Sequence, residues 1–227
     1  VIAIDGPAGS GKSTLARRLA ETLDLPYVNT GLMYRAVTLE ALRRNLDLEN
    51  GRALGELAAG IRFELDPSGD PATLLIDGEE PSPGLASADV ERHVSIVSAH
   101  PDVRRVLRER QRLLGRSGAV MEGRDIGSVV FPMASVKLYL IAPARIRAAR
   151  RIRERGGADG SEGVEEAAPK ISGDLAGALA ARDERDERVN PFVPPEGAVP
   201  LDTEGKDAHE VFEEALSLVR ARLEGST

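Results

Sequence analysis

A glycine-rich segment close to the N-terminus has the spacing of a phosphate-binding loop. Gly6 is followed, after four intervening residues, by Gly11, Lys12 and Ser13. Glycines let consecutive backbone N–H groups converge on phosphate oxygens, and a helix that begins near Gly11 directs its positive dipole end towards the anion. The lysine then reaches the β- and γ-phosphates of a nucleoside triphosphate, and the Ser13 hydroxyl can face Mg²⁺. The residues expected to contact this ligand are Gly6, Pro7, Ala8, Gly9, Ser10, Gly11, Lys12, Ser13 and Thr14.

The residues on either side of this segment support that interpretation. Residues 1–4 form an uninterrupted apolar run, typical of a buried strand, and Leu15, Leu19 and Leu23 recur at helical spacing behind the glycines. An ordinary glycine turn between a strand and a helix is the alternative, and this context makes it the weaker one. We therefore predict a protein that binds a nucleoside triphosphate.

The composition is that of one compact α/β domain. The chain has 227 residues, no cysteine and a formal net charge of −7. It has no charged-then-apolar leader and no apolar run approaching the roughly 18 residues of a membrane span. We expect a cytoplasmic monomer that binds no membrane and, because nonspecific backbone binding needs a basic excess, no nucleic acid. Nearly all of the 30 basic residues are arginines, which suit bidentate phosphate recognition, although genomic base composition also explains this bias.

Strand and helix patterns alternate along the chain, which is typical of a parallel sheet with helices on its faces. Five short apolar strands are predicted at 1–4, 27–29, 119–121, 136–141 and 199–202. Helices are predicted up to about 23 and over 32–44, 86–99, 102–114, 171–188 and 207–223, with another from Ala144, and a polar glycine-rich loop over 156–163.

Residues 61–80 interrupt this alternation. The segment 61–65 alternates apolar and polar residues, 67–71 contains two prolines and a glycine, and 73–78 resumes a strand pattern. This is the signature of an antiparallel hairpin inserted between helices.

Four segments together resemble bacterial cytidylate kinases, within the nucleoside monophosphate kinase group. They are residues 6–14, 30–35, 122–127 and 182–186, and the likeness extends over essentially the whole chain. The resemblance implies a P-loop NTPase fold with a five-stranded parallel sheet flanked by helices, an inserted monophosphate-binding subdomain that contains a small antiparallel sheet, and a short lid. It implies a core over 1–33, 100–149 and 166–227, the subdomain over 34–99 and the lid over 150–165. The implied reaction converts ATP and CMP or dCMP to ADP and CDP or dCDP.

The residues expected to bind the monophosphate come from separate parts of the chain. Arg35 falls within one turn of a helix N-terminus, where a second phosphate is well placed. The resemblance implies that Arg35 binds the acceptor phosphate and that Thr30 and Tyr34 line the same pocket. Without the resemblance, Tyr34 is equally consistent with a core residue. The resemblance implies that Asp186 binds the ribose hydroxyls and that Arg182 contacts the transferring phosphate or the acceptor. Without the resemblance, residues 182–186 would be interpreted as an exposed helix with salt bridges. The family has a further arginine after this segment, and the only candidate here, Arg188, lies one position too early in the sequence.

The resemblance also implies that the edge of the cytosine base is bound by Ser95, Arg104 and Asp125. Cytosine offers an amine donor and two acceptors, N3 and O2, so a carboxylate and a guanidinium complement it. Uracil has an acceptor in place of the amine and a donor at N3, so it does not fit the same pair. From the residues alone, Ser95 reads as an ordinary helix serine, and Arg124 with Asp125 reads as a structural ion pair after a buried strand.

Catalysis in this family relies on positioning and charge neutralisation rather than on a nucleophile. Six arginines crowd residues 145–155, where the plain alternative is a solvated charged face; the family spacing selects Arg147, Arg150 and Arg151. The residues expected to act on the transferring phosphate are Lys12, Arg124, Arg147, Arg150, Arg151 and Arg182. Mg²⁺ is expected to arrive with ATP and to meet Ser13.

Three alternatives remain at this point. A kinase for UMP or AMP is the nearest, and a P-loop kinase of a small metabolite such as shikimate is next, although the insert at 61–80 counts against it. A GTP-dependent switch is disfavoured because the sequence lacks an Asn-Lys-x-Asp string for reading guanine.

Overall fold

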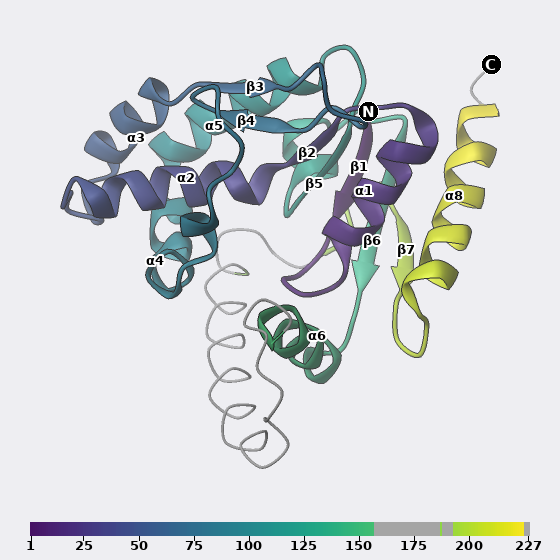
Figure 1. The fold of residues 1–227 in the computed structure, drawn as a ribbon. Helices are drawn as coiled ribbons and strands as arrows, with labels where there is room; N and C mark the ends of the chain where they lie inside the picture. The colour runs from purple at the N-terminus through teal and green to yellow at the C-terminus, as the bar shows by residue number, and fades with distance from the viewer. Residues whose placement is uncertain (157–186, 188–192, 225–227) are drawn as a thin grey trace.

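The computed structural model describes the backbone of residues 1–156, 187 and 193–224, and their side chains apart from those of 151–156. Its centre is a five-stranded sheet in the order β2-β5-β1-β6-β7 (Figure 1). The strands are β1 (Ile2–Asp5), β2 (Tyr27–Asn29), β5 (Val120–Gly123), β6 (Val136–Ile141) and β7 (Val199–Asp202). All neighbouring strands are parallel, so their carboxyl ends meet at one edge, where α/β proteins bind ligands.

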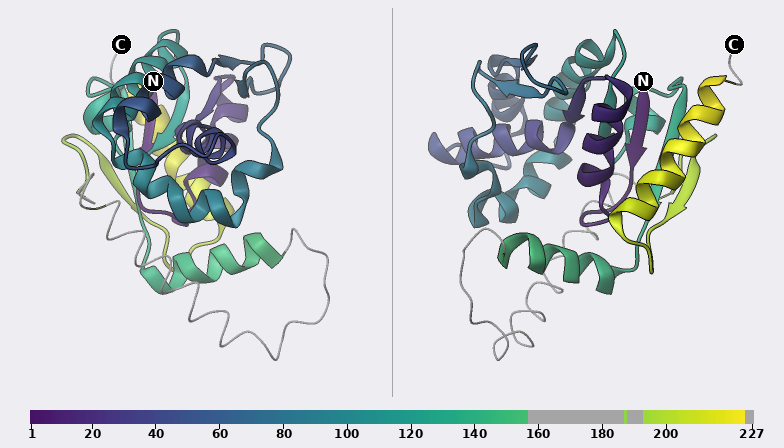
Figure 2. Two further views of the ribbon diagram at one scale, coloured as in Figure 1. Left: turned by 90° about the vertical axis from the view of Figure 1, so that its left-hand side faces the viewer. Right: turned by 45° about the vertical axis from the view of Figure 1, so that its right-hand side comes forward.

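Alternate residues of the central strand β1 face two different helix layers. Ile2 and Ile4 pack into a core with α1 (Lys12–Leu23) and α8 (Ala208–Glu224), which lie side by side on one face (Figure 2). Ala3 faces the opposite way, towards η2 (Ile126–Val130) and the end of α5 (Pro101–Gly115). A strand that is covered on both faces must be apolar throughout, which explains the run at residues 2–4.

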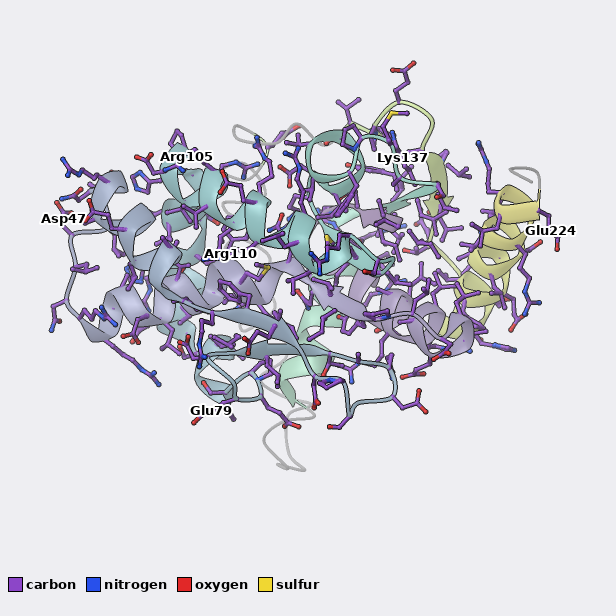
Figure 3. All side chains as sticks on the ribbon, turned by 90° about the horizontal axis from the view of Figure 1, so that it is seen from above. Asp47, Glu79, Arg105, Arg110, Lys137 and Glu224 are labelled. Carbon is purple, nitrogen blue, oxygen red and sulfur yellow. The ribbon has the colours of Figure 1, made fainter. Side chains whose placement is uncertain are left out.

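The insert between β2 and β5 has a hydrophobic core of its own. It contains α2 (Thr30–Arg43), α3 (Gly51–Gly60), η1 (Pro83–Ala86) and α4 (Ala88–Ala99), and the hairpin of β3 (Phe63–Leu65) and β4 (Leu74–Ile76) is antiparallel. Together with α5 it extends the molecule to one side of the sheet (Figure 1). Seen from above, Asp47 between α2 and α3 and Glu224 at the end of α8 lie at opposite ends of the molecule (Figure 3).

The helix α6 (Ala144–Gly156) follows β6 and crosses the carboxyl edge of the sheet (Figure 1). It therefore lies next to the glycine-rich segment after β1.

The predicted five-stranded parallel sheet and the inserted antiparallel pair are confirmed. Helix α3 was not predicted, because three of its ten residues are glycines, which are poor helix formers. Gly55 is needed for packing, since a Cβ there would lie 2.7 Å from the Cβ of Asp102 on α5. The five-residue η2 was also not predicted. The loop predicted over 156–163 and the helix predicted over 171–188 lie, except for Gly156 and Glu187, outside the described residues.

Candidate active site

The glycine-rich segment after β1 forms a tight loop that leads into α1. Gly6 has φ 148°, and a Cβ there would lie 2.6 Å from the Leu140 carbonyl oxygen, so only glycine fits this approach to β6. Lys12, at the first turn of α1, is 9% exposed and its Nζ donates to the Pro7 carbonyl at 2.8 Å. The lysine therefore folds back over the loop. Ser13 is exposed, and its hydroxyl is available at the mouth of the loop.

Two arginines of α6 hold this loop from the other side. Arg147, 6% exposed, donates from Nη1 to the Ala8 carbonyl at 3.0 Å and from Nε to the Ala142 carbonyl at 3.1 Å. Arg150 lies one turn further along the same helix face and donates to the Ser10 carbonyl at 3.1 Å. Both guanidinium groups thus lie beside the loop, while the side chain of Arg151 is outside the described residues.

Arg150 is also tied to the turn after β7. Its Nη1 donates to the Thr203 hydroxyl and its Nη2 to the Thr203 carbonyl, each at 3.0 Å. Thr203 is 1% exposed. No local pattern indicates this contact, because the two residues belong to segments that are far apart in the sequence.

Arg35 projects from the first turns of α2 into the same pocket. Its Nη2 lies 2.6 Å from the Glu91 carboxylate in the first turn of α4, and its Nη1 donates to the Leu85 carbonyl of η1 at 2.9 Å. The side chains of Arg35 and Glu91 are 14% and 19% exposed. This guanidinium is held by the insert, a role for Glu91 that sequence reasoning missed.

Arg104 and Asp125 form a second partly buried ion pair. Arg104 Nη2 lies 2.6 Å from Asp125 Oδ2, and the two side chains are 13% and 12% exposed. They come from α5 and from the turn after β5. The described partner of Asp125 is thus Arg104, and Nη1 of Arg124 donates to the Gly6 carbonyl at 3.0 Å.

Tyr34 and Ser95 line the pocket beside this pair. Ser95 is buried and Tyr34 is partly buried. Burial raises the pKa of Tyr34 to about 12, although the nearby Arg104 charge acts in the opposite direction. Tyr34 is therefore a protonated hydroxyl at neutral pH. Its hydroxyl hydrogen-bonds to the buried Gln111 of α5, which is 1% exposed.

Glu122 is a pocket residue that sequence reasoning missed. It lies at the carboxyl end of β5, next to β1, and is 3% exposed. The Tyr27 hydroxyl donates to its Oε1 at 2.6 Å, and the Thr30 hydroxyl donates to its carbonyl at 2.7 Å. Burial, and after it the Glu122 carboxylate, raise the pKa of Tyr27. The signal available in the sequence was the acidic Glu122 at the end of an otherwise apolar predicted strand.

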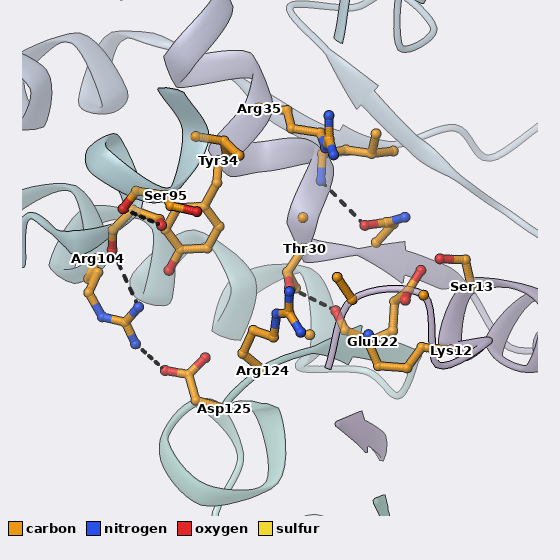
Figure 4. A pocket seen from close by; sticks show the side chains of 18 residues that line it. Lys12, Ser13, Thr30, Tyr34, Arg35, Ser95, Arg104, Glu122, Arg124 and Asp125 are labelled. Atoms are coloured by element: carbon orange, nitrogen blue, oxygen red, sulfur yellow. Dashed lines mark hydrogen bonds and ion pairs between the residues drawn. The ribbon is translucent and has the colours of Figure 1, made fainter. Parts of the chain in front are cut away.

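These residues meet in one pocket with two distinct ends (Figure 4). The loop end comprises Ala8, Gly9, Lys12 and Ser13. We call Tyr34, Arg35, Ser95, Arg104 and Asp125 the far end; four of them lie together in Figure 4, and Arg35 lies apart from these, above Thr30. Thr30, Glu122 and Arg124 lie between them in Figure 4. Arg147 and Arg150 contact the loop from outside the pocket lining, and Arg182 and Asp186 lie outside the described residues.

The arrangement suits two anionic ligands placed end to end. Lys12 supplies a cation at the loop end, and Arg35, Arg104 and Arg124 supply cations towards the far end. Oxygen ligands for Mg²⁺ fit between them, because the Ser13 hydroxyl and the Glu122 carboxylate line the same pocket. Among the described residues, no group of three or more His, Cys, Asp or Glu is arranged to hold a metal by itself, so a metal here would share its coordination with phosphate.

Comparison with known proteins gives one consistent result. The cytidylate kinase family model matches residues 2–221. The chain is 40% identical to a cytidylate kinase of Anoxybacillus flavithermus, over 99% of this chain and 97% of that protein. It is 41% identical to a cytidylate kinase of Limosilactobacillus fermentum, over 98% and 95%. A bifunctional pantoate ligase/cytidylate kinase of Synechococcus sp. is 42% identical, over all of this chain but 42% of that protein.

Within the part of the chain that the structure describes, no helix has both the length and the apolar character needed to cross a membrane.

Proposed function

The chain belongs to the cytidylate kinase family and phosphorylates CMP and dCMP, and we propose that the pocket between the loop end and the far end is where phosphate passes from ATP to the monophosphate. The observation that carries this proposal is the meeting, in one pocket, of Lys12 and Ser13 with Arg35, Arg104 and Asp125. One end has the chemistry for a triphosphate, and the other has the chemistry for a phosphate and a base.

At the loop end, we propose that residues 6–14 bind the ATP phosphates. Backbone N–H groups of the loop would contact the phosphate oxygens, and Lys12, whose Nζ lies 2.8 Å from the Pro7 carbonyl, would turn from that carbonyl to the β- and γ-phosphates. Arg147 and Arg150 neutralise charge from the α6 side, where their bonds to loop carbonyls support a place beside the donor phosphates. Arg151 and Arg182 are proposed for the same role from the family resemblance alone.

At the far end, we propose that Arg35 and Arg124 hold the acceptor phosphate and that Arg104, Asp125 and Ser95 read the cytosine edge. The ion pair between Arg104 and Asp125 presents a donor group and an acceptor group side by side. A uracil edge would leave the carboxylate facing a carbonyl oxygen, which penalises the wrong base. Thr30 and Tyr34 complete the wall, and Asp186 is proposed for the ribose hydroxyls.

We propose Ser13 and Glu122 as the protein groups that share Mg²⁺ with ATP. Bound there, the ion would neutralise charge on the donor phosphates. The protein's own contribution is to align the two nucleotides and to keep the cationic side chains in place, because phosphoryl transfer in such sites needs positioning and charge rather than a covalent intermediate.

The division into a core over 1–33, 100–149 and 166–227, a monophosphate-binding subdomain over 34–99 and a lid over 150–165 is also part of this proposal. The hydrophobic core of the insert supports a separate unit, but it also includes Val103, Val106 and Leu107 of α5, so the boundary at residue 99 rests on the family resemblance alone. A monomeric state and a cytoplasmic location stay predictions from the sequence.

A steady-state rate panel tests the proposed function. With ATP and Mg²⁺, turnover should be measured for CMP, dCMP, UMP and AMP, with each product identified. We expect CMP and dCMP to exceed UMP in kcat/KM by at least about tenfold, since base selection rests on buried polar groups. Equal efficiencies for CMP and UMP would contradict the assignment of the far end.

A further inference from the structure

Asp5 is a buried carboxylate that the proposed roles leave unused. It is the last residue of β1, directly before the phosphate-binding loop, and it is 1% exposed. Its Oδ1 accepts a hydrogen bond from the Ile126 backbone N–H at 2.8 Å, and its Oδ2 accepts one from the Gly127 N–H at 2.7 Å. Both oxygens therefore act on the same short segment after β5.

A charge in this position costs free energy. The pKa of Asp5 is raised to about 6 because the effect of burial outweighs the two backbone N–H groups, which lower it; the Asp125 charge also raises the pKa and the Lys12 charge lowers it. A buried carboxylate is tolerated where fixed donors satisfy it. Here those donors belong to the segment that carries the far-end residues.

The segment that Asp5 holds is the turn 124–127, which begins with Arg124 and Asp125. A third hydrogen bond joins the same two segments in the opposite direction, because Arg124 Nη1 donates to the Gly6 carbonyl at 3.0 Å. The turn packs closely against Asp5: a Cβ at Gly127 would lie 3.2 Å from Asp5 Oδ2 and 3.2 Å from Lys137 Cγ. The loop strand and the turn are thus fixed to each other by three hydrogen bonds.

We propose that Asp5 is a positioning residue that fixes the turn 124–127 against the phosphate-binding loop, so that the donor and acceptor phosphates meet at a set separation. The proposal rests on the proposed roles of Arg124 and Asp125. It follows from geometry, since Asp5 is one residue from Gly6 and its carboxylate holds the two residues that follow Asp125. A displacement of about 1 Å between reacting groups lowers rate by about 100-fold.

Asp5→Asn is the direct test. An asparagine oxygen can still accept from Ile126, but its NH₂ group would face the Gly127 N–H, donor against donor. We expect kcat at saturating ATP and CMP to fall about 10- to 100-fold, with the KM for ATP changed less than threefold. Amide exchange at Ile126 and Gly127, followed by NMR in the ligand-free protein, should become faster while exchange in α8 stays unchanged.

Asp207→Asn is the matched control. Asp207 also accepts from two backbone N–H groups, those of His209 at 2.7 Å and Glu210 at 2.9 Å, but it lies exposed at the start of α8. Because one amide oxygen can still accept both bonds and Asn caps a helix as well as Asp, this variant should leave kcat unchanged and the melting temperature nearly so. Gly127→Ala disturbs the same contact from the turn, because the added Cβ would lie 3.2 Å from Asp5 Oδ2. We expect kcat to fall at least about fivefold. This variant replaces Asp5→Asn if that protein does not fold.

The possible outcomes separate the two proposals. A folded Asp5→Asn protein with wild-type kcat, or with loss of kcat but unchanged exchange at residues 126 and 127, overturns the role of Asp5. Wild-type kcat in a folded Gly127→Ala protein overturns it equally. If Arg124→Ala and Asp125→Ala also keep wild-type kcat/KM for CMP, the proposed function of the far end fails instead.

Discussion

The loop end and the far end of the pocket are stabilised in different ways. At the loop end, cations bond to backbone carbonyls, as Lys12 does with Pro7 and Arg147 with Ala8. At the far end, cations bond to carboxylates from other elements, as Arg35 does with Glu91 and Arg104 with Asp125. A carbonyl is a weak partner that phosphate can replace, whereas a partly buried carboxylate forms a strong charge-assisted bond.

The difference suggests a division of labour. If the proposed assignment holds, loop-end cations would exchange a carbonyl for the donor phosphates and so bring their charge to the reacting groups. Far-end cations keep fixed partners that orient them, so their substrates meet a preformed surface. Substitutions at the loop end should therefore reduce turnover, and those at the far end should change binding and base choice.

The largest expected effect is that of Lys12→Ala. The lysine charge acts on the donor phosphates, where loss of a transition-state cation costs on the order of several kcal/mol, so kcat should fall at least about 1,000-fold. CMP binding, measured by calorimetry without ATP, should stay within about threefold because Lys12 belongs to the loop end. Lys206→Ala removes an exposed lysine that pairs with Glu214 on α8 and should change neither quantity. A strong loss of CMP affinity in Lys12→Ala would remove the distinction between the two ends.

The next prediction concerns Asp5, which joins the two ends. Its folded-state pKa is about 6 against 3.8 for the free side chain, so the folded protein binds the proton more tightly. This group adds stability that is complete below about pH 4 and is lost as the pH rises to about 6, up to about 3 kcal/mol. Asp5→Asn should remove that decline.

Urea unfolding at a series of pH values measures the effect. The unfolding free energy of wild type minus that of Asp5→Asn should fall between pH 4 and 6.5 and then level off. Titrations of groups that do not interact with Asp5 are common to both proteins and cancel in this difference. A difference that does not vary with pH would mean that Asp5 does not titrate in this range.

The loop end could be predicted from the sequence because its residues are consecutive. The spacing of Gly6, Gly11 and Lys12 alone specifies a backbone conformation and a ligand type. The interior strands β1, β5 and β6 were predicted for a similar reason, since each is a largely apolar run between the two faces of the sheet. Helix α3 was missed because its glycines lower local helix propensity, while the packing of Gly55 against Asp102 lies in another segment.

The far end could not be derived in the same way. Glu91 lies 56 residues from Arg35, and Glu122 lies 95 residues from Tyr27. No local pattern records such distant pairs. Ser95, Arg104 and Asp125 were identified only through resemblance to a family, and the structure places them in one pocket. Their roles stay predictions until base selectivity is measured.

Asp125→Asn tests base choice at the far end. The amide can donate to the O4 of uracil, where the carboxylate could only accept. We expect the ratio of kcat/KM for CMP to that for UMP to fall by about 10- to 100-fold, corresponding to about 1–3 kcal/mol for a buried charge-assisted hydrogen bond.

The matched control is Asp102→Asn, on the same helix as Arg104. Asp102 pairs with Arg105 at 3.8 Å, and both side chains are at least half exposed, so the ratio should not change. A general loss of stability in Asp125→Asn would lower both efficiencies together and leave their ratio intact. An unchanged ratio would assign Asp125 to the scaffold.

The smallest expected effect is that of Glu91→Ala, which tests whether the ion pairs at the far end orient their arginines. Without the carboxylate 2.6 Å away, the Arg35 guanidinium loses one of the contacts that fix its direction, and CMP binding must then restore that order. The KM for CMP at saturating ATP should rise about three- to tenfold, or about 1 kcal/mol, with kcat and the KM for ATP unchanged. Glu91→Gln keeps an acceptor oxygen and should show a smaller rise. Glu56→Ala breaks an exposed ion pair with Arg52 in the same insert and should leave every constant unchanged. A lower KM for CMP in Glu91→Ala would show instead that the carboxylate competes with the acceptor phosphate, and the far end would then resemble the loop end in exchanging its partner for the substrate.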